Sequence, residues 1–555
     1  MSDTLAITPL DRYLAEQRSL TAVERFARFH EADLIAPGTS SYTQLLPLER
    51  PGPGQQYAFE VDLDSCTGCK SCVTACHNLN GLDDGESWRS VGLLHGGSAA
   101  VAFQQTVTTT CHHCAEPACL TGCPVDAYEK DDTTGIVRHL DDQCIGCRYC
   151  MLTCPYEVPR FNPARGIVRK CDLCAGRLEA GEAPACAQAC PNGAIRITLV
   201  DTAAARARAV TEPFLPGAPD PRITVPTTRY RSTRAHLHEA TPADAVAIRP
   251  AAAHAPLAVM LVLTQLSVGT FLVELAGRTL LSGSLVGAAR PGNGIVALAL
   301  ALLALSVSVL HLGRPAYAFR AVLGFRHSWL SREIVAFGAY ACLAAAVAGA
   351  RFAGVHGAPL SGLEAVAAAA GVAGLACSVM VYAATRRTWW RGFTVAWKFG
   401  LTAVVCGLGT FLAVALAGSG LVGSGSGTTA MSRAGRTLAE LGRPLALALA
   451  VATVLKLAAE ASVFRHRPPG DLWRTTLLLR RDLVTLTRWR FGLGLSGGVL
   501  APLLILALAA DKTPSMGVGA ALAVLGLVAL VAGELCERSQ FFRAVAPPRM
   551  PGSPG

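Results

Sequence analysis

The chain has 555 residues, 20 of them cysteine, and a formal net charge of +10. Its length exceeds that of one ordinary domain, and its mean hydropathy of +0.38 excludes an ordinary soluble protein and favours a membrane portion. The arginines of the second half cluster between apolar runs, so membrane topology explains the positive charge and nucleic-acid binding is set aside.

Residues 1–56 are predicted to form an N-terminal helical extension. Val23, Phe26 and Phe29 recur every three residues among charged ones, as on the packing face of a helix or on a helix that docks a partner. The first residues show neither a basic start followed by an apolar core nor paired arginines. We therefore expect this part in the cytoplasm, where dense cysteines are more often metal or cluster ligands than disulfides.

Residues 57–200 are predicted to form a compact α+β domain built by duplication of one cysteine unit. Short alternating stretches such as YAFEVDL and GIVRHL predict small strands. Sixteen cysteines fall into four groups along this domain. The first group is Cys66, Cys69, Cys72 and Cys76; the second is Cys111, Cys114, Cys119 and Cys123; the third is Cys144, Cys147, Cys150 and Cys154; the fourth is Cys171, Cys174, Cys186 and Cys190.

The spacing within these groups favours [4Fe–4S] clusters. In the third group the cysteines are separated by two, two and three residues and followed by Pro155, a run in which three thiolates bind one cluster and the fourth binds its neighbour. Sixteen thiols supply four clusters with none left over. Structural zinc is the alternative, with His112 and His113 as nitrogen ligands, but zinc does not require a third cysteine within the same turn or a closing Cys-Pro pair.

Residues 201–254 are rich in proline, alanine, threonine and arginine and are predicted to be a linker. Residues 255–537 contain eight apolar stretches of spanning length, and 538–555 are left as a C-terminal tail. The stretches begin near Ala255, Gly294, Ile334, Leu363, Phe399, Pro444, Phe491 and Met516. The sequence thus predicts an all-α, eight-helix transmembrane bundle, which makes membrane lipid a partner.

Charge bias predicts the orientation of the bundle. An even number of spans places the cysteine domain on the same side as the loops after spans two, four and six, and those loops carry most of the basic residues. They are Arg314, Arg320, Arg326, Arg332, Arg386, Arg387, Arg391, Lys398, Arg465, Arg467, Arg474, Arg480, Arg481, Arg488 and Arg490. By the positive-inside rule, the cysteine domain is expected on the cytoplasmic face of the inner membrane.

Charged residues within or beside the spans are candidates for function because they are costly in lipid. For Glu274, Lys456 and Glu460 we favour a structural role, since Lys456 and Glu460 are four apart and can neutralise each other. His311 and Glu333 bracket the loop after the second span, on the side of the cysteine domain, and His311 and Arg314 are expected on one helical face. A titratable pair here can accept protons from a bound substrate; helix-end hydrogen bonding and N-terminal capping are the structural alternatives.

The motifs CTGCKSCVTAC, CHHCAEPACLTGCPVDA, CIGCRYCMLTCPYEVP and CDLC with CAQACPNGAI resemble the iron–sulfur subunit of the dimethyl sulfoxide reductase family of molybdenum enzymes. The resemblance implies a ferredoxin-like fold and crossed ligation by four sets, which we name after their first cysteines. They are the Cys66 set (Cys66, Cys69, Cys72, Cys190), the Cys171 set (Cys171, Cys174, Cys186, Cys76), the Cys111 set (Cys111, Cys114, Cys119, Cys154) and the Cys144 set (Cys144, Cys147, Cys150, Cys123).

The same resemblance implies positions for two of these clusters. The Cys144 cluster lies nearest the membrane, and the Cys66 cluster lies nearest a catalytic subunit. In some relatives a tryptophan replaces the third cysteine of the Cys144 group and the cluster has three irons; Cys150 stands there in this chain, so four irons are expected.

The stretch from His311 to Ile334, HLGRPAYAFRAVLGFRHSWLSREI, resembles the quinol-oxidising anchor subunit of the same enzymes, with the match strongest at His311, Arg314, Ser331, Arg332 and Glu333. Two subunits are thus expected to be fused, passing electrons from the quinone pool, as menaquinol or ubiquinol, to a separate molybdopterin-containing catalytic subunit. The histidines of the second half form no obvious pair at mid-span that could ligate a haem, so no haem is expected. The rivals are reverse flow, from a dehydrogenase to quinone, and a membrane-tethered iron–sulfur sensor or scaffold.

Overall fold

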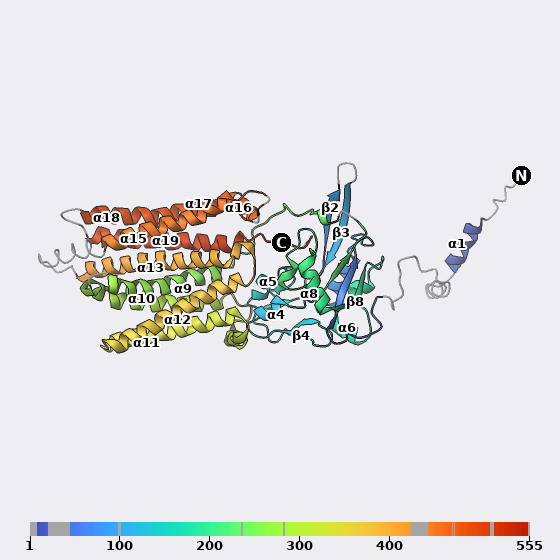
Figure 1. Ribbon diagram of the computed structural model, residues 1–555, viewed down its shortest axis with the longest axis horizontal. Helices are drawn as coiled ribbons and strands as arrows, with labels where there is room; N and C mark the ends of the chain where they lie inside the picture. Colours follow the sequence, from blue (N-terminus) through green and yellow to red (C-terminus); the bar gives the residue numbers. More distant parts are fainter. Residues whose placement is uncertain are drawn as a thin grey trace.

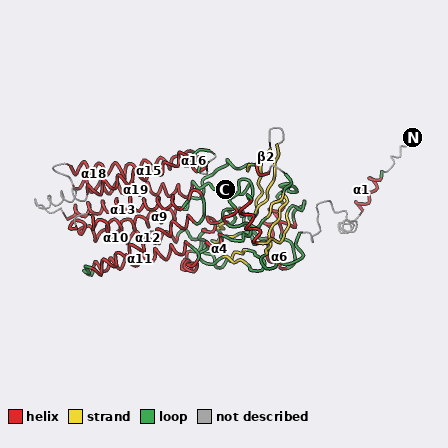
Figure 2. Tube along the Cα trace, in the orientation of Figure 1, coloured by secondary structure: helices red, strands yellow, loops and turns green. Residues whose placement is uncertain are grey.

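The computed structural model of the chain describes residues 8–19, 45–97, 102–234, 237–280, 283–422, 442–468, 470, 472–510 and 516–552. Two parts lie end to end (Figure 1): a cysteine-rich part with all the described strands and a bundle of long helices. Figure 2 shows the same division, with strands and loops at one end and helices at the other. The expected fold class, a small-sheet α+β domain followed by an all-helical bundle, is confirmed. Val23, Phe26 and Phe29 lie outside the described residues.

Two three-stranded sheets and two short hairpins form the framework of the cysteine-rich part. The sheet orders are β8-β1-β9 and β10-β2-β3, and β4 pairs with β5 and β6 with β7. The strands are β1 (Gln55–Asp62), β2 (Ser90–Gly97), β3 (Ala102–Thr109), β4 (Tyr128–Lys130), β5 (Val137–His139), β6 (Arg160–Asn162), β7 (Ile167–Arg169), β8 (Ile195–Asp201), β9 (Arg229–Arg231) and β10 (Thr241–Pro242). The first and last long strands, β1 and β8, pair antiparallel and close the unit.

Short helices carry the cysteines between these strands. Outside the bundle the helices are α1 (Pro9–Ser19), α3 (Ser71–Leu79), α4 (Ala118–Gly122), α5 (Tyr149–Thr153), α6 (Ala175–Glu179), α7 (Ala185–Gln188), α8 (Thr202–Thr211), η2 (Pro221–Ile223) and η3 (Leu237–Glu239). Helix α3 packs on α7, and α4 packs on α5. These two pairings bring the first cysteine group to the fourth and the second to the third.

The segment 201–254, predicted from its composition to be a linker, contains strands and short helices. Strand β9 adds parallel to β1, and β10 adds antiparallel to β2, so both sheets are completed by this segment. Asp201 caps α8 by accepting a hydrogen bond from the backbone of Ala204, 2.7 Å away. Proline and alanine here lie in turns and a short helix that cover the cysteine-rich part. Composition alone did not reveal these long-range pairings.

Eight helices long and apolar enough to cross a membrane occur among the described residues, as predicted. The bundle elements are α9 (Ala255–Leu280), α10 (Gly283–Val309), η4 (Pro315–Arg326), α11 (Trp329–Phe352), α12 (Ala358–Ala383), η5 (Thr388–Trp390), α13 (Gly392–Val422), α15 (Arg443–Ala461), η7 (Ser462–Arg465), α16 (Trp473–Arg480), α17 (Val484–Leu495), η8 (Ser496–Leu500), α18 (Ala501–Ala510) and α19 (Met516–Arg543). The last helix continues to Arg543, past the predicted end at 537. Helices α9 and α13 are the most buried and form the centre.

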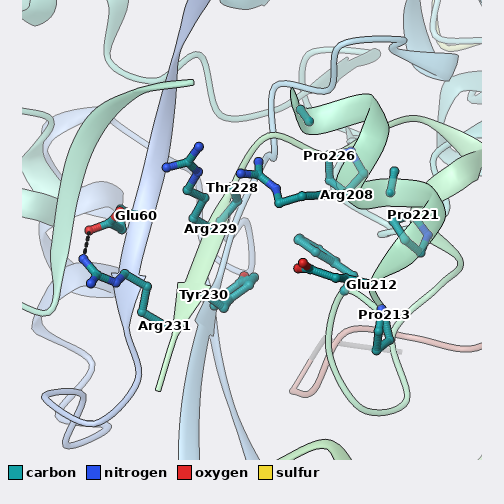
Figure 3. A pocket seen from close by; sticks show the side chains of 13 residues that line it. Glu60, Arg208, Glu212, Pro213, Pro221, Pro226, Thr228, Arg229, Tyr230 and Arg231 are labelled. Atoms are coloured by element: carbon teal, nitrogen blue, oxygen red, sulfur yellow. Dashed lines mark hydrogen bonds and ion pairs between the residues drawn. The ribbon is translucent and has the colours of Figure 1, made fainter. Parts of the chain in front are cut away.

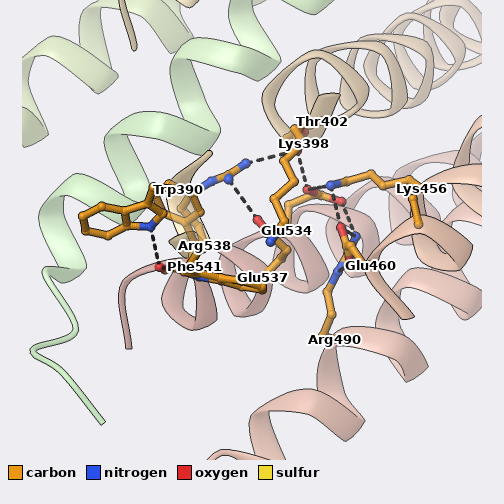
Figure 4. Close-up of polar contacts among 12 residues, drawn as sticks. Trp390, Lys398, Thr402, Lys456, Glu460, Arg490, Glu534, Glu537, Arg538 and Phe541 are labelled. Atoms are coloured by element: carbon orange, nitrogen blue, oxygen red, sulfur yellow. Dashed lines mark hydrogen bonds and ion pairs between the residues drawn. The ribbon is translucent and has the colours of Figure 1, made fainter. Parts of the chain in front are cut away.

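A buried network of charges joins the second half of the bundle (Figure 4). Its members come from α13, α15, α17 and α19 and are Lys398, Lys456, Glu460, Arg490, Glu534, Glu537 and Arg538. The predicted Lys456–Glu460 pair is present at 2.7 Å, but it is one link of a larger set. Lys398 and Arg490, interpreted from sequence as loop charges, are buried here, because ion pairing with the glutamates offsets their desolvation.

The C-terminal segment returns from α19 to the cysteine-rich part and packs into its core. Met550 is fully buried beside Val61, Leu94 and Val107. The Gly552 N–H donates to Asp244 Oδ2 at 3.2 Å. The C-terminal segment, predicted from the sequence to be a tail, therefore connects the two parts of the chain by its contacts.

Removing the Met550 side chain should destabilise the cysteine-rich part. We expect Met550→Ala to lower its free energy of unfolding by about 2–5 kcal/mol, because the cavity left in a packed core cannot be refilled. Denaturant unfolding of the purified chain measures this change. Val246→Ala is the control, since Val246 is 72% exposed and should change stability by less than about 0.5 kcal/mol. Equal effects of the two variants would contradict the packing described here.

Candidate functional site

The four cysteine groups share one backbone conformation, which the sequence encodes locally. In each group the residue before the second cysteine has a positive φ: Gly68 at 73°, His113 at 40°, Gly146 at 69° and Leu173 at 60°. The first and third groups repeat this at the residue after the second cysteine, at Lys70 and Arg148. Such left-handed residues turn the chain tightly so that successive thiols face one centre. The repetition supports the duplication inferred from spacing.

Four cysteines from two distant groups line one cavity. Cys66, Cys69 and Cys72 lie around it with Cys190, more than a hundred residues later in the chain. The Cys190 thiol accepts a hydrogen bond from the Ala194 N–H at 3.3 Å. The structure thus brings together all four members of the Cys66 set.

A second cavity gathers the Cys111 set in the same way. Cys111, Cys114, Cys119 and Cys154 line it, together with His112 and Lys170. The Nε2 atom of His112 is buried and has no hydrogen-bond partner among the described residues, while its Nδ1 lies 3.0 Å from Thr228 Oγ1. A buried polar atom without a partner at a cavity lined by thiols fits a site that holds a further group.

The other two sets also converge. Cys76 lies close enough to Cys174 and Cys186 for their charges to interact, and Cys171 interacts with Cys76. Cys123 interacts in the same way with Cys144, Cys147 and Cys150. For each crossed set expected from the resemblance, the fold therefore brings the four cysteines close to one another.

Hydrogen bonds and buried cations suit these thiol sets to clusters that carry net negative charge. Backbone N–H groups of Ala127, Gly146 and Leu173 donate to Cys123, Cys144 and Cys171 at 3.3–3.4 Å. Such bonds to sulfur tune the reduction potential of a cluster.

Lys170 and Arg89 are the cations buried beside the thiols. Burial alone would lower the pKa of Lys170, but the negative charges of three cysteine thiolates outweigh it and raise that pKa. Thiolates likewise raise the pKa of the buried Arg89 despite its desolvation. Both side chains therefore stay cationic and can neutralise charge on a bound cluster.

The Cys144 set lies against the bundle. The Gly313 N–H donates to the Gly146 carbonyl at 3.3 Å, and the Arg314 N–H donates to that of Ile145 at 3.0 Å. A Cβ at Gly313 would collide with the carbonyl of Gly166, so only glycine permits this close approach. On the other side of the set, the Ser328 hydroxyl donates to the Gly122 carbonyl at 2.8 Å.

His311 lies at this junction and is 5% exposed. Its imidazole lies close enough to the backbone of Cys147, a member of the Cys144 set, for the two to interact. Its ring meets that of His254 edge to face, with 5.2 Å between the centroids. Burial, with the charges of His254 and Arg148, lowers the pKa of His311 to about 3, so the imidazole is neutral at neutral pH.

Glu333 lies on α11 and is buried at the same end of the bundle. Its carboxylate accepts a hydrogen bond from Ser378 on α12 and interacts electrostatically with Tyr149, which follows Cys147 by two residues. Because this carboxylate faces the neighbouring helix, it does not cap its own helix, whose N-cap is Ser328. No hydrogen bond joins Glu333 to His311 in this described part of the chain; each approaches the segment Cys147–Cys150 separately.

Arg314 differs from its predicted place on one helical face with His311. Helix α10 ends at Val309, so both residues lie in the turn beyond it. The guanidinium donates to the backbone carbonyl of Asp141 at 2.8 Å. This contact makes Arg314 part of the junction between the two parts of the chain.

Sequence reasoning missed two residues at the junction. Tyr149 donates from its hydroxyl to the Val381 carbonyl at 2.7 Å and so fixes the third cysteine group on α12. Its position between Cys147 and Cys150 could have drawn attention to it. His254 gave no signal, because it precedes the first span and meets His311 only in the folded chain.

Comparisons with known proteins match both parts. Residues 102–199 match the family described as "4Fe-4S dicluster domain", and residues 251–543 match the family described as "DMSO reductase anchor subunit". The second match alone covers more than half of the chain.

Curated relatives match the cysteine-rich part. The chain is 36% identical over 156 residues to the B subunit of the anaerobic dimethyl sulfoxide reductase of Haemophilus influenzae, which covers 26% of this chain and 76% of the relative. It is 36% identical over 154 residues to that of Escherichia coli (26% and 75%). It is 38% identical over 149 residues to a thiosulfate reductase electron transfer subunit of Salmonella typhi (26% and 77%). The chain belongs to the dimethyl sulfoxide reductase family and is a fusion of its [4Fe–4S] electron-transfer subunit with its membrane anchor subunit.

Proposed function

We propose that this chain oxidises quinol at the membrane and passes the electrons through four [4Fe–4S] clusters to a separate molybdopterin-containing catalytic subunit. The observation that carries the proposal is the contact between His311, at the end of the second span, and Cys147 of the Cys144 set. An electron donor held beside His311 is separated from the nearest cluster ligand by one side chain. That proximity is what direct transfer from quinol to cluster requires.

The clusters are assigned to the Cys66, Cys171, Cys111 and Cys144 sets. Two cavities lined by four cysteines each, and two further convergent sets, support this crossed assignment. When bound, the clusters supply one-electron transfer, so a two-electron donor can be oxidised in two steps. The chain's own contribution is to hold the thiols, donate N–H bonds to sulfur and keep Lys170 and Arg89 charged beside them.

Quinol binding is assigned to His311 and Glu333. Quinol oxidation releases two protons with two electrons, so the site needs proton acceptors or hydrogen-bond partners near the hydroxyls. A neutral imidazole can accept one hydroxyl proton in a hydrogen bond, and a buried carboxylate can accept the other. Arg314 is assigned to positioning, because it fixes the loop carrying His311 to the backbone beside the third cysteine group.

Replacing either acceptor tests this assignment. We expect His311→Gln and Glu333→Gln each to slow quinol oxidation by about a hundredfold or more, the usual contribution of a positioned acid–base group, while the iron content stays unchanged. The assay follows quinol-driven bleaching of the clusters in the anaerobically purified chain. His356→Gln is the matched control, because His356 is exposed in the loop that follows α11, at the other end of that helix from Glu333. Wild-type rates in both variants would instead favour a tethered iron–sulfur sensor or scaffold.

The direction of electron flow is assigned from the family. The matched anchor family and the two B-subunit relatives are named for reductases, which supports flow from quinol to the partner. Flow in reverse is favoured by one observation, a 34% identity over 158 residues to a formate dehydrogenase iron–sulfur subunit of Escherichia coli, of which the chain covers 52%. Adding quinol and then quinone to the purified complex separates the two directions.

The multi-pass bundle is assigned to the inner membrane with the cysteine-rich part on the cytoplasmic face. The basic residues outside the spans on that side support the orientation, even without Lys398 and Arg490. We expect a membrane-impermeant amine label to leave the exposed Lys70 unmodified in intact cells and to modify it after lysis. Labelling of Lys70 in intact cells would place this part outside.

A further inference from the structure

The segment 201–254 forms a cavity on the cysteine-rich part that no assigned function uses (Figure 3). Its volume is about 560 Å³, within the range of small-ligand sites. Helix α8, η2 and strand β9 form its walls, with Arg208 and Arg229 facing it beside Thr228, Tyr230 and Phe214. The cavity is separate from the cysteine sets: the Thr228 hydroxyl lies 3.0 Å from His112 Nδ1, so His112 stands between the cavity and the Cys111 set.

Arg208 and Arg229 place two positive charges together. Their proximity is seen in the pKa of Arg208, which burial and the charge of Arg229 both lower. The Nε atom of Arg229 is buried without a hydrogen-bond partner. Among the described residues no carboxylate lies within 4.0 Å of either guanidinium; Glu212 acts on Arg208 only from farther away.

Neighbouring arginines are neutralised within the chain. Arg231 and Arg196 both pair with Glu60. The Arg231–Glu60 distance is 3.2 Å, and both of these residues line the same cavity. On α8, Arg206 pairs with Glu116 at 3.0 Å. Arg222 pairs with Asp220 at 2.6 Å. Of the arginines that the structure describes at and beside this cavity, Arg208 and Arg229 are thus the two without an acidic partner within 4.0 Å, and they lie close to each other.

We propose that Arg208 and Arg229 form a binding site for an oxyanion, a carboxylate or phosphate group, in this cavity. Two guanidinium groups offer paired N–H donors that match the oxygens of such a group. An anion that binds both arginines would also offset the repulsion between their positive charges. The buried Nε of Arg229 supplies a donor already freed from water. The oxyanion comes either from a free small molecule or from an acidic side chain of the catalytic partner; the second source rests on the proposed function.

The test is binding of inorganic phosphate to the purified, full-length chain, with chloride holding the ionic strength constant. Phosphate should raise the thermal unfolding temperature saturably, because a ligand that binds only the folded state stabilises it. Arg208→Gln and Arg229→Gln should each weaken the apparent affinity about tenfold, as expected for loss of one charge-assisted contact. Arg206→Gln, on the same helix but paired with Glu116, is the matched control and should bind phosphate as the wild type does.

Removing two unpaired like charges should not unfold the chain, so both glutamine variants are expected to unfold in chloride at the wild-type temperature or above. Arg208→Lys with Arg229→Lys retains the charge if a glutamine variant fails to fold, and should bind phosphate more weakly than the wild type because lysine lacks the paired donors.

The purified complex with the catalytic partner then distinguishes the two sources. If the oxyanion is a free molecule, phosphate stabilises the complex as it does the isolated chain. If the partner supplies it, phosphate has no effect on the complex and the two glutamine variants weaken partner binding about tenfold. Two results together overturn the proposal: phosphate binds the wild type no better than the Arg208→Gln, Arg229→Gln double variant, and these substitutions leave partner binding unchanged. Quinol-driven bleaching of the clusters would still test the proposed function separately.

Discussion

Cys147→Ser should remove one cluster from the chain and stop the delivery of electrons from quinol. Cys147 is a member of the Cys144 set and contacts His311, so it stands where the proposed donor meets the first cluster. A serine hydroxyl is a poor substitute for a soft thiolate ligand. We expect about four fewer irons per chain and a fall in quinol-driven cluster bleaching of at least about a hundredfold, measured anaerobically by iron and sulfide determination and by stopped-flow absorbance.

Cys342→Ser is the matched control for this experiment. Cys342 is an exposed free cysteine within α11, far from the four sets in sequence, and its loss should change neither iron content nor bleaching. If Cys147→Ser keeps its full iron content and its rate, Cys147 does not ligate a cluster and the junction described here is not where electrons enter the chain.

Glu534→Gln should cause a large loss of stability in the bundle. Glu534 is fully buried, and its carboxylate lies 2.9 Å from Arg490 and 3.3 Å from Lys456. It also accepts a hydrogen bond from Thr402 at 2.8 Å. The neutral amide removes one of the two carboxylates that Lys456 and Arg490 share and leaves both buried cations to Glu460 alone, which costs about 3–5 kcal/mol. Unfolding of the chain in lipid bicelles, followed by circular dichroism, measures the change.

An exposed pair provides the comparison. Glu116→Gln removes the ion pair between Glu116 and Arg206, two side chains that are each more than half exposed. It should lower the free energy of unfolding by less than about 1 kcal/mol. Equal losses for Glu534→Gln and Glu116→Gln would mean that water reaches the network inside the bundle and that its ion pairs do not hold α15, α17 and α19 together.

Features encoded by neighbouring residues could be predicted from the sequence. The eight spans follow from runs of apolar residues, and the four cysteine groups follow from spacing. Gly68 and Gly146 supply the left-handed turns between the thiols, which is why the motif itself sets the local geometry. The convergence of Cys190 with Cys66 came from the family resemblance, because no local rule brings together residues so far apart.

Features that depend on distant contacts could not be predicted. Strand β9 forms because Arg229 to Arg231 pair with the edge of β1. Composition alone indicated a linker there. The sequence pattern of Trp389 and Trp390 is typical of anchors at the membrane interface, yet both residues are buried and donate their indole N–H to the Phe541 carbonyl at 3.1 and 3.0 Å. A tryptophan beside arginines has the same sequence pattern in both settings.

Determining iron, acid-labile sulfide and zinc in the anaerobically purified chain tests the central claim, that sixteen thiols hold a path of clusters beginning beside His311. Four clusters of four irons predict about sixteen irons and about sixteen sulfides per chain, with no zinc. Zinc at about one ion per cysteine set, with neither iron nor sulfide, would contradict the account, because zinc has no redox chemistry and cannot carry the electrons of a quinol.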